Sequence, residues 1–157
     1  MTLKFYRARN FLRRSRFEKL WFLPTLLLLG LSRLAIKTIP FRYFAHRLGR
    51  HNGITVWIPI LSPLSEARAL SIARVVQLAA CHTPWESNCF PQAITARMLL
   101  GLYGIPYSLF FGVQIAPFAA HAWVAAGRVR VAGGESFSCF TVVNCFTSAI
   151  PPSANPP

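Results

Sequence analysis

Two residues of this 157-residue sequence have the types and positions needed for nucleophilic catalysis. Cys89 follows Ser87 and Asn88 at the predicted start of a helix, where unpaired backbone N–H groups and the helix dipole favour a thiolate over a thiol. His121 lies 32 residues later, on a predicted strand. A cysteine at a helix N-terminus with a histidine on a following strand is a nucleophile-and-base arrangement. Spacing alone leaves a second interpretation open, in which both side chains simply pack in the core.

The remaining cysteines do not indicate a disulfide or a metal site. Cys139 and Cys145 fall in one predicted strand, where a rise of about 3.3 Å per residue would keep them roughly 20 Å apart. Cys81 and Cys89 do not have a C-x-x-C spacing or any other spacing usual for zinc. We therefore expect reduced thiols, no metal, and a cytoplasmic protein.

Acidic residues are scarce, which limits the possible chemistry. The four acids are Glu18, Glu66, Glu86 and Glu135, and the sequence contains no Asp. Carboxylate-rich Mg²⁺ or Ca²⁺ sites, an aspartyl dyad and a triad completed by aspartate are thereby excluded. Glu135 is the only acid after His121 and could orient its imidazole as a third catalytic member. The alternative is that Glu135 is a turn residue at the end of a hairpin.

Positive charge is concentrated in the first third of the chain. The formal net charge is +13, and twelve of the seventeen Lys and Arg residues lie within residues 1–50. This distribution suits an anionic partner or an anionic membrane surface. Nucleic acid is not expected as a partner, because the chain after residue 50 is nearly neutral and offers no basic groove.

An apolar run of thirteen residues spans residues 20–32 and ends at Arg33. It is shorter than the roughly 20 residues that a transmembrane helix needs. We expect a buried amphipathic helix packed on the domain, with Pro24 tolerated near its start. A helix associated with a membrane surface, or a signal or anchor segment, remains an alternative.

The apolar periodicity places helices before strands. Residues 17–50 are predicted to be helical with a break at residues 39–40, residues 65–81 form a helix capped by Ser65, and residues 82–88 form a connector. A short strand is expected at residues 54–58. The Cys89 helix is expected over residues 89–102, with Pro91 in its first turn. Strands are predicted at residues 107–115, 120–126, 128–132 and 137–146, with Gly127 at a hairpin turn. This order predicts an α+β fold with an antiparallel sheet.

Several motifs in a fixed order resemble one known family, the lasso-peptide biosynthesis protein B family of leader peptidases. That family has a transglutaminase-like, papain-like cysteine-protease fold. The resemblance covers roughly residues 17–146. The residues that carry it are Cys89-Phe90-Pro91-Gln92-Ala93, Met98-Leu99-Leu100, Tyr103-Gly104-Ile105, Phe111-Gly112-Val113 and His121-Ala122-Trp123-Val124, preceded by Leu20-Trp21, Ile39-Pro40-Phe41 and Arg47-Leu48-Gly49.

The resemblance implies a cysteine endopeptidase that removes the leader from a ribosomally made precursor peptide. Cys89 matches the nucleophile and His121 the general base. Trp85, Gln92 and Trp123 are candidate substrate-binding residues, although packing is the simpler role for both tryptophans, and a helix cap is the simpler role for Asn88. No cofactor is implied for this chain; ATP is expected only for a partner cyclase that resembles asparagine synthetase.

The expected organisation has three parts: a basic segment at residues 1–16, one protease domain at residues 17–147, and a Pro-rich disordered tail at residues 148–157. The helical front is residues 17–81 and the sheet is residues 107–146. The first segment is too short for a leader-recognition domain, so a separate leader-binding protein is expected. Membrane contact, if any, is expected to be peripheral.

The sequence departs from the family where an Asp commonly follows the histidine by about a dozen residues. That position falls near Gly133, so either Glu135 or a backbone carbonyl must hold His121. Two other readings remain: a non-enzymatic membrane-surface or scaffold protein, and another transglutaminase-like acyl transferase or amidase.

Overall fold

The computed structural model describes residues 14–45, 48–85, 87–134 and 136–148. Its helices are α2 (Arg16–Thr38), α3 (Phe41–Ala45), α4 (Pro63–Ala80) and α5 (Cys89–Leu102), with a short 3₁₀ helix η1 (Ser136–Cys139). Its strands are β1 (Arg50–His51), β2 (Ser108–Gln114), β3 (Ala119–Ala126), β4 (Val129–Ala132) and β5 (Thr141–Thr147).

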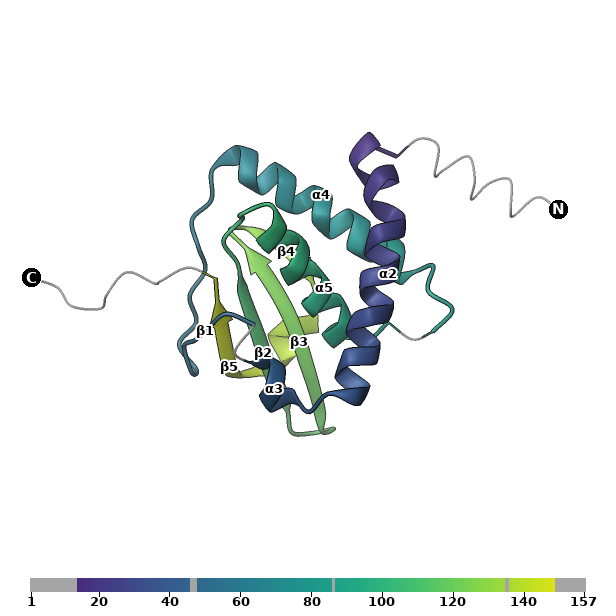
Figure 1. Ribbon diagram of the computed structural model, residues 1–157. Helices are drawn as coiled ribbons and strands as arrows, with labels where there is room; N and C mark the ends of the chain where they lie inside the picture. The colour runs from purple at the N-terminus through teal and green to yellow at the C-terminus, as the bar shows by residue number, and fades with distance from the viewer. Residues whose placement is uncertain (1–13, 46–47, 86, 135, 149–157) are drawn as a thin grey trace, which may run out of the picture.

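The strands form a single antiparallel sheet in the order β1-β5-β2-β3-β4. Helix α5 packs against β3 and β4, α4 packs against β4, and α2 packs on α4 and α5 (Figure 1). The molecule therefore has a sheet, a layer made by α4 and α5, and α2 as an outer helix. This arrangement confirms the predicted α+β class.

The main core lies between the sheet and the α4–α5 layer. Small side chains on the two helices, such as Ala79 and Ala96, are completely buried and let the helices approach the sheet closely. Larger apolar side chains from both layers fill the space between them. Completely buried examples there are Ile72, Leu100, Leu109 and Val124. This packing fixes the position of α5, and with it the position of Cys89, relative to β3.

The two central helices begin close to the predicted positions. Helix α5 has the predicted bounds, and Pro91 lies in its first turn. Helix α4 starts two residues earlier than predicted, and its cap is Ser62 rather than Ser65: the Ser62 Oγ accepts a hydrogen bond from the Ser65 backbone N–H at 3.3 Å. Pro63 supplies the first helical residue, where its missing N–H costs no hydrogen bond.

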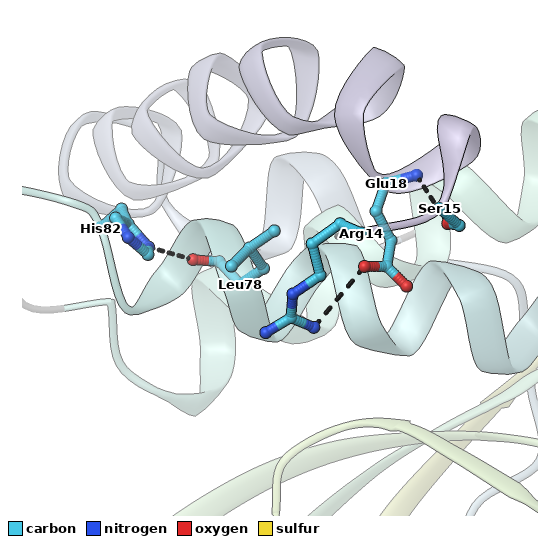
Figure 2. Close-up of polar contacts among 5 residues, drawn as sticks. All are labelled: Arg14, Ser15, Glu18, Leu78 and His82. Carbon is cyan, nitrogen blue, oxygen red and sulfur yellow. Dashed lines mark hydrogen bonds and ion pairs between the residues drawn. The ribbon is translucent and has the colours of Figure 1, made fainter. Parts of the chain in front are cut away.

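Helix α2 is longer than its apolar run. It begins after Ser15, whose Oγ accepts a hydrogen bond from the Glu18 N–H at 3.2 Å (Figure 2). Pro24 consequently lies inside the helix and not near its start, which corrects the sequence prediction. It is tolerated because it lies on the exposed side, where the carbonyl it leaves unpaired one turn earlier can be solvated. The predicted break is confirmed, since the helix ends at Thr38, two residues before Pro40.

Helix α2 buries a narrow face that is partly polar. Thr25 and Ser32 are buried together with Leu29, whereas most leucines of the run face outward. The inner face is partly polar because Ser32 forms a hydrogen bond with Thr95 of α5, with their hydroxyl oxygens 3.2 Å apart. By length and composition α2 could also cross a membrane, because the helix extends beyond residues 20–32 at both ends.

Two strand predictions are wrong in detail. Residues 54–58 contain no strand; the pairing with β5 comes earlier, from Arg50 and His51. Residues 137–146 are not one strand, because η1 occupies the first part and β5 begins at Thr141. The segment 1–13 and most of the predicted tail, residues 149–157, lie outside the described residues.

Candidate active site

Cys89 is the first residue of α5, as the sequence predicted. The N-cap position belongs to Asn88, but its side chain makes no capping hydrogen bond. The first backbone N–H groups of a helix have no acceptor within the helix, and together with the dipole they favour negative charge at this end. The Cys89 thiol is half-buried and is not part of a disulfide. It therefore has the local environment of a nucleophilic cysteine.

His121 faces the same cleft as Cys89. The cleft has a volume of about 410 Å³ and is mostly apolar. Its floor and walls come from the start of α5 and from β2, β3 and β5. The lining residues are Cys89, Phe90, Phe111, Gly112, Val113, Ala120, His121, Ala122, Val143 and Asn144. The fold thus brings together the two residues that the sequence singled out.

The imidazole of His121 is held by a backbone carbonyl. Its Nε2 lies 2.6 Å from the carbonyl oxygen of Gly133, which follows the end of β4. A carbonyl can only accept, so Nε2 carries the proton in this hydrogen bond. In the neutral ring Nδ1 then has the free lone pair, and this nitrogen can act as a base.

Gly133 is able to make this contact because it has no side chain. Its φ is +99°, and a Cβ at this position would lie 2.4 Å from the Cβ of Trp123 and 2.8 Å from the carbonyl oxygen of Ala122. An aspartate at residue 133 would therefore collide with β3. Because Gly133 has no side chain, its backbone approaches β3 closely enough for its carbonyl to reach the His121 ring.

Aromatic rings fix the plane of the imidazole. Phe140 stacks on His121 with ring centroids 4.9 Å apart and planes inclined by 27°, and Trp123 stacks with centroids 5.8 Å apart. Gly112 pairs with His121 across β2 and β3, and a Cβ there would come within 2.9 Å of both Phe140 and Trp123. Gly112 thus leaves room for the two aromatic side chains that pack around the histidine.

The other three cysteines do not line the cleft. Cys81 is exposed after α4, Cys139 is exposed on η1, and Cys145 is completely buried in β5. Burial raises the pKa of the Cys145 thiol, an effect that a hydrogen bond with the backbone of Trp57 partly opposes. A buried, protonated thiol is a poor nucleophile. No group of three or more His, Cys, Asp or Glu suited to a metal ion occurs within the described part of the chain.

None of the candidate substrate-binding residues is among those that line the cleft. Trp85 packs over Gly30 of α2, and Trp123 is buried between Phe110 and His121. Gln92 donates a 2.6 Å hydrogen bond from Nε2 to the Ser87 carbonyl and lines a neighbouring groove with Gly133. Glu135, the third catalytic candidate of the sequence analysis, lies outside the described residues.

Asn144 is a site residue that the sequence analysis missed. It lies on β5 opposite Phe111 and lines the cleft with Cys89 and His121. Its Oδ1 is buried and has no hydrogen-bond partner among the described residues. A sequence signal did exist, because Asn144 is the one amide side chain in an otherwise apolar or hydroxyl-bearing strand.

Comparison with known protein families agrees with this geometry. The transglutaminase-like superfamily matches residues 35–145, which includes α5, β2, β3, β4 and most of β5. No curated protein and no solved structure matches the chain. Members of the superfamily are usually cysteine-dependent enzymes, and the domain is compatible with cysteine protease or acyltransferase activity. The match covers well over half of the sequence, and the chain therefore belongs to the transglutaminase-like superfamily.

Proposed function

We propose that this protein is a cysteine endopeptidase that removes the leader from a ribosomally made lasso-peptide precursor. The observation that carries the proposal is the shared cleft of Cys89 and His121, with His121 held by the Gly133 carbonyl. The ordered motifs around these residues support the choice of substrate, because they resemble those of the lasso-peptide leader peptidases.

The chemistry follows from the orientation of the imidazole. With Nε2–H donated to Gly133, Nδ1 accepts the thiol proton of Cys89. The thiolate sulfur then attacks the scissile carbonyl carbon, forming a C–S bond and a tetrahedral oxyanion. The C–N bond breaks as His121 returns the proton to the leaving amine. Water finally hydrolyses the thioester, which releases the leader with a free carboxylate and regenerates the thiol.

Two groups are suited to stabilise the oxyanion. The backbone N–H of Cys89 belongs to the first turn of α5, where helix geometry leaves it without an intrahelical acceptor. Asn144 provides an amide in the same cleft, and its Nδ2 is the second donor. The mostly apolar lining lowers the local polarity and so strengthens both interactions.

The proposal extends to partners and location. The precursor peptide is the substrate, a separate leader-binding protein presents it, and an asparagine-synthetase-like cyclase uses ATP to close the ring afterwards. No cofactor is required by the chain itself for cysteine-dependent hydrolysis. We propose that the reaction takes place in the cytoplasm.

In the decisive experiment, the purified protein is incubated with the precursor peptide encoded next to its gene, with and without the leader-binding protein. The products are followed by mass spectrometry. We expect cleavage at one site, accelerated by the leader-binding protein because tethering raises the effective concentration of the scissile bond, commonly into the mM range. Cys89→Ala should abolish cleavage, whereas Cys81→Ala and Cys139→Ala should retain it.

Two results would contradict the proposal. One is a fully active Cys89→Ala variant. The other is an unchanged precursor under all conditions while a small amine is joined to a glutamine or ester substrate in a Cys89-dependent reaction. The second result would leave Cys89 and His121 as the catalytic residues, but the reaction that they catalyse would be acyl transfer and not peptide hydrolysis.

A further inference from the structure

Helix α2 presents a continuous stripe of leucines to the outside of the molecule. Spacings of three, four, four and three residues place the five side chains on one face of the helix. They are between 58% and 74% exposed, which is unusual for five leucines on one helix face. At 1.5 Å per residue the stripe is about 21 Å long. Its members are Leu20, Leu23, Leu27, Leu31 and Leu34.

The opposite face of α2 is attached to the domain by polar and apolar contacts. Glu18 is only 4% exposed, and Ser32 forms its hydrogen bond with Thr95 of α5. Trp21 packs edge-on against Tyr103, at the C-terminal end of α5, with ring centroids 5.8 Å apart. The helix is therefore fixed with its leucines outward, and the exposed stripe is a property of the folded domain.

Cationic side chains stand at both ends of the stripe and none lies within it. Arg16 is exposed one turn before Leu20, and Lys37 is exposed one turn after Leu34. Beyond the end of α2, Arg42 and Tyr43 are also exposed, with the guanidinium 4.8 Å from the ring centroid. The only acid of α2, Glu18, is on the buried face. The outer surface of α2 thus combines leucines with positive charge alone.

We infer that this stripe docks on an anionic lipid bilayer, with α2 lying in the plane of the interface. Leucine side chains reach the boundary between headgroups and acyl chains, while Lys and Arg extend to lipid phosphates. A tyrosine beside the helix end is well suited to the same region. The inference is independent of the proposed peptidase activity, and it accounts for both the leucines and the net charge of +13.

The geometry favours an in-plane helix over two other arrangements. A spanning helix would have to leave α4 and α5, which would separate Ser32 from Thr95 and Trp21 from Tyr103 and would place Arg33 within the spanning segment. A second copy of the chain would pair two leucine stripes whose ends all carry cations, so either orientation places like charges together. A bilayer of anionic lipid has neither problem.

The test is flotation of the full-length protein with vesicles of phosphatidylcholine alone or mixed with phosphatidylglycerol. We expect the protein to float with the mixed vesicles and to detach as salt is raised, because the charges are exposed. The double variant Leu27→Ser/Leu31→Ser keeps every charge and should bind about tenfold or more weakly. Leu64→Ser is the matched control, because Leu64 is a 79% exposed leucine on α4 and should leave binding unchanged.

Circular dichroism melting should show that all variants remain folded, since every substituted leucine is exposed. The inference is overturned if the wild-type protein fails to float with the mixed vesicles, or if the double variant floats as well as the wild type. It is also overturned if the leucine stripe supports a dimer or a complex with a partner protein in the absence of lipid, detected by light scattering and abolished by the double variant.

Discussion

The Nε2 atom of His121 lies 2.6 Å from the carbonyl oxygen of Gly133, twelve residues further along the chain. Triads of this general type use a carboxylate side chain to hold the histidine. Here a main-chain group makes the contact, which is possible because Gly133 approaches β3 more closely than any residue with a Cβ could. The carbonyl fixes the tautomer and the ring position, but it supplies less negative charge than a carboxylate would.

Gly133→Ala should impair both folding and catalysis. A Cβ would lie 2.4 Å from the Trp123 Cβ, so the backbone must move away and carry the carbonyl from His121. We expect cleavage to fall by roughly 10- to 100-fold, since a misplaced acid–base group loses at least that much. Gly134→Ala is the control: its φ is +64°, but a Cβ there meets nothing within 4 Å. That variant should lose about 1–2 kcal/mol of stability and keep its turnover rate. Equal losses of activity in both variants would show that the Gly133 carbonyl has no special role.

Glu135→Gln should leave cleavage close to the wild-type rate. The nitrogen that a carboxylate would hold is already occupied by the Gly133 carbonyl, so removal of the Glu135 charge costs little. Replacing the orienting aspartate of a serine-protease triad by asparagine, by contrast, costs about 10⁴ in turnover. The measurement is kcat for precursor cleavage by the two proteins. A loss of tenfold or more, in a variant with an unchanged melting temperature, would restore Glu135 as the third catalytic member.

Much of the fold could be predicted because its helices and strands have clear apolar periodicity and because particular residues mark where they begin and end. The bounds of α5 follow from Cys89 at the start and Gly104 just past the end, and Gly127 marks the β3–β4 turn with a φ of +58°. The shared site of Cys89 and His121 could also be predicted, because the start of a helix and the strand that follows it can both be recognised in the sequence.

Other features depend on partners that sequence patterns do not reveal. The inward face of α2 includes Ser32 because Thr95 offers it a hydrogen bond 63 residues away, so the rule that leucine faces inward fails. The group that holds His121 is a backbone carbonyl, which no side-chain motif can indicate. Residues 136–139 form η1 where the apolar pattern predicted a continuous strand, and Phe140 between η1 and β5 stacks on His121.

Stability should decline in alkaline solution partly because of Cys145. Burial raises the pKa of this thiol above its ordinary value of 9.0, so the folded protein retains the proton at a pH where the unfolded chain loses it. The unfolded state then binds fewer protons, and the free energy of unfolding falls as the pH rises through that value. The melting temperature of the wild type should therefore drop more steeply above about pH 9 than that of Cys145→Val, which cannot ionise. Parallel pH profiles for the two proteins would contradict this assignment.

Asn144→Ala should lower the rate of the chemical step while leaving precursor binding almost intact. The Asn144 amide lines the cleft beside Cys89 and His121, so its Nδ2 can donate a hydrogen bond to a substrate oxygen bound there. An oxyanion donor acts mainly in the transition state, and the loss of one costs about 10²–10³ in kcat in a well-studied protease. We expect a decrease in kcat of that order with KM changed by less than about threefold. Asn144→Asp preserves the shape but replaces the donor with a negative charge, and it should be at least as impaired. A purely structural Asn144 would instead give an unstable protein with normal turnover per folded molecule, which active-site titration of Cys89 together with a melting curve would distinguish.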